Sequence, residues 1–281
     1  MSAITAQGGP RQRSAGGGLL TVATWIIGLG FFFPVLWMVL TGFKQERDAY
    51  TDVPRVVFAP TLQQFANVFE RGVLPYLGNS AFATLVSTIL VVLLATPAAY
   101  ALSMRPVKKT QDVLFFFIST KMLPVAAVIV PLYVAAQALS MLDNVWMLII
   151  LYTSMNLPIA VWMMRSFFQE VPGAIVEAAS VDGASLWRTL WQIILPVIAP
   201  GLAATALICV IFSWNEFFFA VNLTASNAAT VPVFLVGFIT TKGQYFAQLS
   251  AAATLASLPV IVAGWIAQKQ LVRGLSMGAV K

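Results

Sequence analysis

The amino-acid sequence predicts an all-α integral membrane protein with six transmembrane helices, and three observations lead to this fold class. Of the 281 residues, 59% are hydrophobic and only 9% are charged, whereas about 25% are charged in a typical soluble domain. A soluble protein of this composition could not cover its surface with polar groups, but a chain in lipid needs no such cover. The apolar residues also form runs of about 20, the length that an α-helix needs to cross a bilayer. Finally, Lys and Arg gather at the ends of these runs.

The predicted spans follow one another along the whole chain. They are Leu19–Phe43, Tyr76–Met104, Val113–Ala138, Val145–Phe168, Val197–Val221 and Gln248–Ala267. The first run is longer than the apolar part of a cleavable signal peptide, which has about 7–15 residues, so we expect it to be a span.

The basic residues predict the orientation, because cytoplasmic flanks carry an excess of Lys and Arg. If both ends are cytoplasmic, the inside residues are Arg11, Arg13, Arg105, Lys108, Lys109, Arg165, Arg188, Lys269, Arg273 and Lys281, and the outside residues are Lys44, Arg47, Arg55, Arg71 and Lys242. The excess inside favours cytoplasmic tails at residues 1–18 and 269–281, with a transmembrane domain at 19–268 between them.

Several classes of function are excluded by what the sequence lacks. It contains no histidine and a single cysteine, Cys209, which lies in an apolar run. Disulfides, His-based zinc sites and His-assisted nucleophiles are therefore excluded, and we expect no metal site and no catalytic residues. No Gly-Lys dipeptide occurs, so the chain has no P-loop. The basic residues form no single patch, which argues against nucleic acid as a partner.

Three segments between the spans are long. Residues 44–75 contain a helix-like stretch, Leu62–Glu70, and predict a small extracytoplasmic cap. Residues 222–247 are rich in Thr, Asn and Gly and are either a connector or a surface for a ligand or partner. The only long inside segment is 169–196, which contains the stretch EAASVDGASLWRTLWQIILP from Glu177 to Pro196.

The inside segment predicts two short helices. Pro172 suits the first helical position, and a helix over Ile175–Asp182 would end at Gly183 in a left-handed conformation. Ser185 could cap a second helix, Leu186–Ile194, which Pro196 would end. Such a pair would project from the membrane as a contact surface, or lie on the headgroups as an amphipathic connector. Spacing alone leaves both interpretations open.

At this point the sequence resembles a known family. The pattern EAA-x3-G-x9-I-x-LP matches, at each defined position, the loop of permease subunits in binding-protein-dependent ABC importers. The chain is most similar to the shorter permease of the maltose-type carbohydrate importers, in its six spans, in Ser213-Trp-Asn-Glu216 and in its last residues, Leu275–Lys281. The segment Thr120–Pro124 and the following Pro131–Tyr133 resemble the sugar-alcohol branch of that group.

The resemblance implies a transport mechanism and its partners. In that family the loop is a coupling-helix pair that sits in a cleft of an ATP-hydrolysing subunit, so Glu177, Ala178, Ala179, Asp182 and Gly183 would form this joint. Arg273 and Lys281 in the C-terminal tail would be a second contact. Two ATP-binding subunits, a second and different permease, and an extracytoplasmic solute-binding protein are implied as partners, the last near residues 222–244. The partner ATPase would use ATP and Mg²⁺, and this chain would be a non-enzymatic inner-membrane subunit that binds no cofactor.

Polar residues within the spans are candidates for the pathway of a sugar or sugar alcohol. Amides, hydroxyls and aromatic faces suit such a solute, and a charge near mid-span should face a partner or water. The candidates are Lys121, Tyr152, Ser154, Asn156, Asn215 and Glu216. These side chains could equally form hydrogen bonds that hold the helices together.

Three alternatives remain in view. An importer of another substrate class could share the loop, although the C-terminal residues and the span layout argue against it. An ion-driven secondary transporter would be expected to have internal repeats and acidic residues in the spans. The sequence shows no convincing repeat, and Glu216 is the only acidic residue within the predicted spans that could serve. An integral membrane enzyme would need a catalytic constellation that the sequence lacks.

Overall fold

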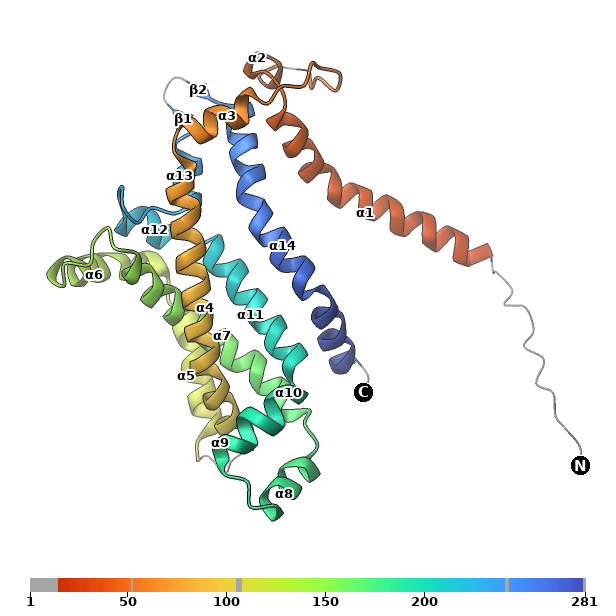
Figure 1. Cartoon of the computed structure of the whole chain (residues 1–281), viewed down its shortest axis with the longest axis vertical. Coiled ribbons are helices and arrows are strands. Elements are labelled where there is room, and N and C mark those ends of the chain that lie inside the picture. The colour runs from red at the N-terminus through yellow and green to blue at the C-terminus, as the bar shows by residue number, and fades with distance from the viewer. Residues whose placement is uncertain (1–14, 52, 105–107, 241–242, 280–281) are drawn as a thin grey trace, which may run out of the picture.

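The computed structural model describes residues 15–51, 53–104, 108–240 and 243–279, and these are almost entirely helical (Figure 1). The helices are α1 Ala15–Gly42, α2 Glu46–Ala49, α3 Gln63–Glu70, α4 Val73–Met104, α5 Thr110–Met122, α6 Val125–Ala138, α7 Val145–Gln169, α8 Gly173–Val181, α9 Leu186–Arg188, the π-helix η1 Thr189–Ile194, α10 Leu195–Val197, α11 Ala199–Trp214, α12 Phe218–Leu223, α13 Val231–Val236 and α14 Phe246–Ala279. Strands β1 (Ile239–Thr240) and β2 (Gly243–Gln244) form one short antiparallel hairpin.

Four of the predicted spans are long single helices, and the other two are broken. By length and composition, Leu20–Gly42 and Phe246–Gln270, within α1 and α14, and all of α4 and α7 could each cross a membrane. The pair α5 and α6 bends by 87°, and the pair formed by Leu186–Val197 and Ala199–Trp214 bends by 83°. The described residues therefore contain four candidate spans, or up to six if each bent pair counts as one.

The prediction of a continuous third span was wrong. The helix that begins at Thr110 ends at Met122, and Pro124 precedes the next helix with extended backbone angles. Proline restricts the preceding residue to extended conformations, and Leu123 has ψ of 124° accordingly. The apolar composition of residues 113–138 hid this break because both halves are equally hydrophobic.

The fifth span also ends earlier than predicted. Helix α11 stops at Trp214, and α12 begins only at Phe218, so residues 197–221 are not one helix. Neither Pro232 nor the Thr- and Asn-containing residues 222–230 lie at this break. Only the polar pair Asn215-Glu216 lies there.

The centre of the molecule lies where α4, α7 and α11 pack together. Small side chains line this contact, since Ala95 and Ala99 of α4 and Ala160 of α7 are completely buried. A Cβ atom added to Gly201 would collide with the ring of Phe167, so α11 approaches α7 too closely for any other residue. Small residues at helix contacts are typical of membrane proteins, in which helices associate by close packing and not by exclusion from water.

Helix α1 is different because it leans away from the rest of the bundle (Figure 1). The most hydrophobic 18-residue window of this helix has no buried residues, and the Phe31 side chain is 82% exposed. Near its end, α1 contacts α14, where a Cβ atom on Gly42 would lie 3.1 Å from the Ala251 backbone. Most of α1 is therefore available to lipid or to a partner chain.

The predicted cap, residues 44–75, and the predicted inside segment, residues 169–196, lie at opposite ends of the bundle (Figure 1). Helices α2, α3 and α13 and the β-hairpin lie at one end, whereas α8, α9 and α10 lie at the other. The helix predicted at Leu62–Glu70 is confirmed as α3. Residues 222–247 are more ordered than the sequence suggested, because they contain α13 and the hairpin.

The boundaries predicted for the tails coincide with no change in structure. Helix α14 continues to Ala279 without a break at residue 268, and α1 begins at Ala15. Residues 1–14 and 280–281 lie outside the described residues.

Candidate functional site

The coupling loop, residues 169–196, begins with a helix that ends as the sequence predicts. Gly183 has φ of +71°, a left-handed conformation that L-residues other than glycine adopt at a cost. The N–H of Ala184 donates to the Ala179 carbonyl at 2.9 Å, and the N–H of Gly183 donates to the Ser180 carbonyl at 3.2 Å. These two bonds form a Schellman motif, which satisfies the last carbonyls of α8 and turns the chain sharply.

The start of the second helix also follows the prediction. The Ser185 hydroxyl accepts a 3.4 Å hydrogen bond from the Arg188 N–H and caps α9. At the other helix, Pro172 is the residue before the first helical position and not that position itself, because α8 begins at Gly173.

Pro196 does not end the second helix, so this prediction was wrong. The chain continues from α9 through η1 and α10 to Val197 and turns only at Ile198. A proline inside an α-helix clashes with the carbonyl four residues earlier. The π-helical turn Thr189–Ile194 lies directly before it, and a wider turn of this kind relieves such a clash.

The predicted coupling residues divide between the surface and the interior of the loop. Glu177, Ala178, Asp182 and Gly183 are exposed, whereas Ala179 is only 4% exposed. Ala179 therefore packs within the loop, and Ala178 is the alanine of the pair that a partner could reach. Neither the Glu177 nor the Asp182 carboxylate has a hydrogen-bond partner among the described residues. The loop thus presents two free acidic groups at one end of the bundle.

A second exposed feature of the loop is its tryptophan pair. The rings of Trp187 and Trp191 stack with centroids 6.1 Å apart, and Trp187 is 67% exposed. A cavity of about 490 Å³ separates the start of α8 from the ends of α4 and α7, with Glu177 at its wall. The loop packs against the bundle through inner side chains such as Ile175, Leu190 and Ile194, and leaves a gap beside Glu177.

The C-terminal coupling candidates are described only in part. Arg273 belongs to α14, and its side chain is outside the described atoms. Lys281 lies outside the described residues altogether.

Among the predicted pathway residues, Tyr152 and Asn156 lie in the interior. They are 1% and 0% exposed. The Asn156 amide donates to the Ser213 hydroxyl at 2.9 Å and to the Tyr152 carbonyl at 3.0 Å, and Ser213 lies 3.3 Å from the Ser87 hydroxyl. These bonds connect α4, α7 and α11. In this conformation both residues hold helices together and are not in contact with solvent, whereas Ser154 of the same helix is exposed.

Lys121 is exposed and lies at the last turn of α5. The sequence suggested a mid-span position, but the break after Met122 moves it to a helix end. Its ammonium donates a 2.9 Å hydrogen bond to the Met155 carbonyl and lies 6.0 Å from the Phe212 ring centroid. Lys121 therefore joins the broken span to α7 and faces α11.

Glu216 lies in the break between α11 and α12. Its carboxylate accepts hydrogen bonds from the N–H groups of Phe219 and Ala220 at 2.8 and 3.3 Å, so it caps the N-terminus of α12. The Tyr152 hydroxyl faces Glu216 and Thr230 without a hydrogen bond of standard geometry. Asn215 is exposed beside it and donates to the Ile211 carbonyl at 2.8 Å.

The sequence analysis missed Asp143, which organises the loop after α12. Its carboxylate accepts hydrogen bonds from the N–H groups of residues 225–228 at 2.9–3.2 Å. Burial raises the pKa of Asp143, but these bonds to the charged form together outweigh it and lower the pKa to about 2. The Asn79 amide holds the same loop by donating to the Asn227 and Ala229 carbonyls at 2.9 and 3.0 Å. The only local signal was that an acidic residue precedes Asn144, the cap of α7. This pattern is too common to predict the contact between Asp143 and Ala225, which are 82 residues apart.

The comparisons with known proteins agree with this geometry. Residues 91–277 match the family model of the binding-protein-dependent transport system inner membrane component. A Sinorhizobium fredii protein named as a probable ABC transporter permease is 42% identical over 94% of this chain and 95% of its own length. The trehalose/maltose transport system permease protein MalG of Thermococcus litoralis is 31% identical over 94% of this chain and 96% of its own length.

A solved structure supports the fold independently of close sequence identity. One chain in the crystal structure of a bacterial ABC transporter that imports the acidic polysaccharide alginate superposes with a TM-score of 0.74 and 21% identity. The match covers 94% of this chain and 99% of that one. The chain therefore belongs to the family of binding-protein-dependent transport system inner membrane components and is a multi-pass subunit of an ABC transporter.

Proposed function

We propose that the chain is the permease subunit of an ATP-driven importer for a sugar or sugar alcohol and forms one half of the translocation pathway. The coupling loop carries this proposal. Its exposed acidic residues, its left-handed stop at Gly183 and its place at one end of the bundle fit a joint to an ATPase subunit. The likeness to a trehalose/maltose permease supports a carbohydrate as the solute.

The orientation follows from this joint. With α8–α10 in the cytoplasm, the chain crosses the membrane six times if the bent pair of α5 and α6 is one span and α11 is another, and both termini are cytoplasmic. The cap formed by α2, α3, α13 and the β-hairpin then lies outside, where a solute-binding protein docks. Each of two ATP-binding subunits uses ATP and Mg²⁺, and one of them holds the loop of this chain.

A second, different permease completes the pathway. The unburied face of α1 fits a chain that needs a partner. Lys121, Ser154 and Asn215 are exposed and are the first candidates for contact with the solute. Tyr152, Asn156 and Glu216 would reach it only after the helices move.

Purification and uptake test this proposal together. The tagged chain, expressed with its neighbouring genes, is expected to copurify with two ATPase copies and one different permease. Reconstituted into vesicles with the solute-binding protein, the complex is expected to import a sugar or sugar alcohol only when ATP is present. A transport-competent homo-oligomer, or uptake driven by an ion gradient, contradicts the proposal. Import of an amino acid or peptide by the same assembly contradicts the carbohydrate part alone.

A further inference from the structure

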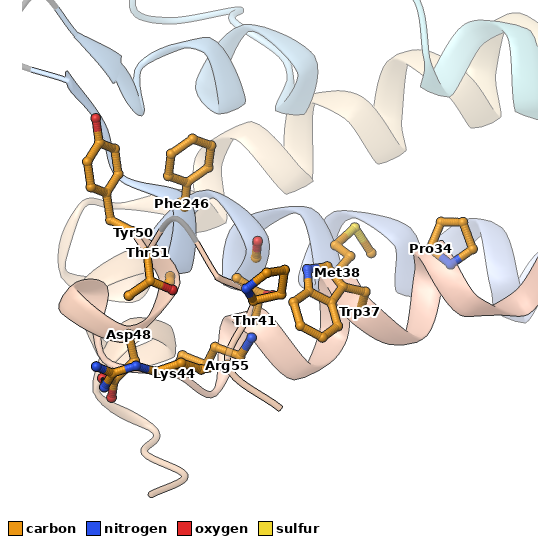
Figure 2. Close-up of a pocket in the computed structure, with 13 residues that line it drawn as sticks. Pro34, Trp37, Met38, Thr41, Lys44, Asp48, Tyr50, Thr51, Arg55 and Phe246 are labelled. Atoms are coloured by element: carbon orange, nitrogen blue, oxygen red, sulfur yellow. Dashed lines mark hydrogen bonds and ion pairs between the residues drawn. The ribbon is translucent and has the colours of Figure 1, made fainter. Parts of the chain in front are cut away.

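A large cavity lies at the outer end of α1, far from the coupling loop. Its volume is about 1040 Å³, comparable to the largest of the usual ligand cavities of about 300–1,000 Å³. The wall comes from the last turns of α1, from α2 and the segment after it, and from the first turns of α14 (Figure 2). Except for Phe246 and Ser250, the lining residues precede residue 91, where the match to the family model begins.

Lys44 brings an unpaired charge to this cavity. The residue is only 2% exposed, and its ammonium lies 3.9 Å from the ring centroid of Trp37 and 5.2 Å from that of Phe58. No acceptor or carboxylate among the described residues forms a hydrogen bond or ion pair with it. Burial lowers the pKa of Lys44, while the nearby Asp48 opposes this effect. A buried cation without a bonded anion is costly, and an anion bound in the cavity would relieve that cost.

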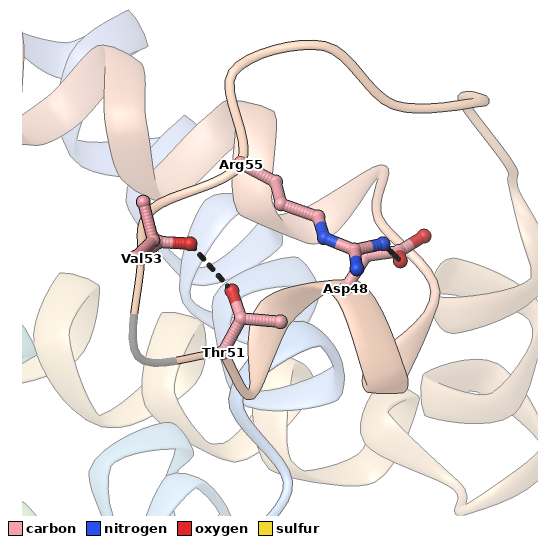
Figure 3. A network of polar contacts seen from close by, with 4 residues as sticks. All are labelled: Asp48, Thr51, Val53 and Arg55. Atoms are coloured by element: carbon pink, nitrogen blue, oxygen red, sulfur yellow. Dashed lines mark hydrogen bonds and ion pairs between the residues drawn. The ribbon is translucent and has the colours of Figure 1, made fainter.

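The one acidic group of the lining is already engaged. The Asp48 carboxylate forms an ion pair with Arg55 at 2.6 Å, as Figure 3 shows. The neighbouring Thr51 hydroxyl donates to the Val53 carbonyl at 2.9 Å in the same network. Among the described lining residues there are two cations, Lys44 and Arg55, and one anion, Asp48. Of these two cations, Lys44 is the one without an ion pair to a described residue.

A second polar group in the wall also lacks a partner. Thr41, which lies on α1 one turn before Lys44, is 7% exposed, and its hydroxyl makes no hydrogen bond. A buried hydroxyl without a partner is unfavourable, because it has lost its hydrogen bonds to water. An unpaired hydroxyl and an unpaired ammonium therefore line the same cavity, and one ligand with several anionic oxygens would satisfy both.

The position of the cavity indicates which anion it takes. It extends from Pro34 on the apolar helix α1 to the polar residues beyond the end of that helix. The apolar side chains along α1, including Phe31 and Phe32, are exposed at 82% and 55%. Trp37 and Tyr50 flank the cavity, as aromatic residues do at the level of lipid headgroups. A headgroup in the cavity would leave its acyl chains beside the part of the apolar surface of α1 that the second permease does not cover.

A neutral sugar fits this cavity poorly, because the aromatic rings are occupied. The ammonium of Lys44 covers the face of Trp37, and Tyr50 packs against Phe246 with centroids 5.6 Å apart. We propose that this cavity binds the headgroup of an anionic phospholipid, with phosphate oxygens bonded to the Lys44 ammonium and the Thr41 hydroxyl. The site is independent of which solute the chain transports.

The test measures lipid binding to the purified transporter complex that contains the full chain. Delipidated wild type is expected to bind a short-chain phosphatidylglycerol, detected by native mass spectrometry and titrated by fluorescence. Lys44→Met and Thr41→Val should each weaken this binding by about tenfold or more, since a hydrogen bond to a charged group contributes about 1.5–3 kcal/mol. Thr41→Val removes a hydroxyl that has no partner in the protein, so this variant is expected to fold even if Lys44→Met does not.

Arg71→Met is the matched control. Arg71 lies at the same end of the molecule and also sits over an aromatic ring, 4.8 Å from the Phe238 centroid, but outside the cavity. This variant should bind the lipid as wild type does. Phosphatidylcholine, which has the phosphate without net charge, should bind more weakly than phosphatidylglycerol.

Three results would overturn the proposal. The first is equal lipid binding by wild type, Lys44→Met and Thr41→Val. The second is a wild-type complex that binds no phospholipid after delipidation, as expected if a partner subunit fills the cavity. The third is glycerol phosphate binding as tightly as the lipid, which would indicate a site for a soluble phosphate and not for a membrane component.

Discussion

Asp143 and Asn227 are joined by three hydrogen bonds although 84 residues separate them in the sequence. The Asn227 N–H is shared between the two carboxylate oxygens at 3.1 and 3.0 Å, and the Asn227 amide donates to Oδ2 at 3.0 Å. This contact ties the start of α7 to the loop between α12 and α13. The loop is thus held in a fixed position, which is what the proposed docking of a solute-binding protein would require.

Replacing Asp143 by Asn should release this loop. An amide offers one acceptor oxygen to four backbone N–H groups and places its own donor against them, so about 1–3 kcal/mol of local stability should be lost. Hydrogen exchange of the amides of residues 225–228 is expected to become faster. Asp112→Asn, in the exposed first turn of α5, should leave that exchange unchanged. Unaltered exchange in Asp143→Asn would show that the carboxylate does not hold the loop.

The pH dependence of this contact follows from the lowered pKa of Asp143, about 2 against an ordinary value of 3.8. Because the folded protein favours the charged form, the stabilisation is complete above about pH 4 and is lost as the pH falls towards 2. Protection of amides 225–228 should therefore be constant, after correction for intrinsic exchange, from neutral pH down to about pH 4. A loss of protection between pH 7 and 5 would contradict the assignment.

Replacing Gly183 by Val should uncouple transport and leave the chain in the membrane. A β-branched residue at φ of +71° is strained by about 1–3 kcal/mol, although a Cβ atom there would meet no atom within 4 Å. The defect would therefore come from the backbone and not from a steric clash. Uptake and ATPase stimulation by the solute-binding protein should both fall.

Gly173→Val is the matched control for that experiment, since Gly173 also has open space around it but no positive φ. It should transport as wild type does. If Gly183→Val transports at the wild-type rate, the loop does not depend on this turn and the coupling assignment fails.

Asn156 and Ser213 should be energetically coupled across α7 and α11. Their 2.9 Å hydrogen bond is completely buried, and such bonds in membrane proteins contribute about 0.6 kcal/mol on average in double-mutant cycles. A cycle with Asn156→Ala and Ser213→Ala, read by unfolding in detergent, should give a coupling of this size. The pair Asn156 and Thr205 shares no hydrogen bond in the structure and should be additive. Additivity of both pairs would mean that the Asn156 bond is not formed in the membrane.

Lys121→Met should reduce uptake without lowering the amount of chain in the membrane. It removes the bond to the Met155 carbonyl that joins α5 to α7, together with the cation proposed for the pathway. Lys121→Arg, which keeps a donor and a charge, should retain most of the uptake. Equal uptake by wild type and Lys121→Met would remove Lys121 from the pathway and from the joint between these helices.

Local features of the coupling loop could be predicted because their causes are local. A glycine four residues after an Ala-Ala pair predicts a left-handed helix stop, and the structure has one at Gly183. Ser185 likewise caps α9 as expected. The predicted helix end at Pro196 was wrong because a π-helical turn in the preceding residues accommodates the proline. Such turns are rare, so the sequence analysis did not expect one.

Residues within the spans were harder to interpret, because polarity alone does not tell which side of a helix faces a neighbour. Asn156 and Ser154 are two residues apart on α7, yet one is completely buried and the other is exposed. Which of them meets Ser213 depends on the rotation of α7 against α11. That rotation is set by close packing of small residues contributed by three helices.

The sequence by itself determined the membrane class, the approximate positions of the spans and the local turns of the coupling loop. Hydropathy, glycine conformation and helix caps depend on residues that are close together in the chain. The tertiary structure alone decided that Tyr152 and Asn156 are interior, and that Asp143 holds a loop far along the chain. It also decided that Lys44 and Thr41 share a cavity. These features depend on which helices are in contact, and this is determined by packing between side chains that are far apart in the sequence.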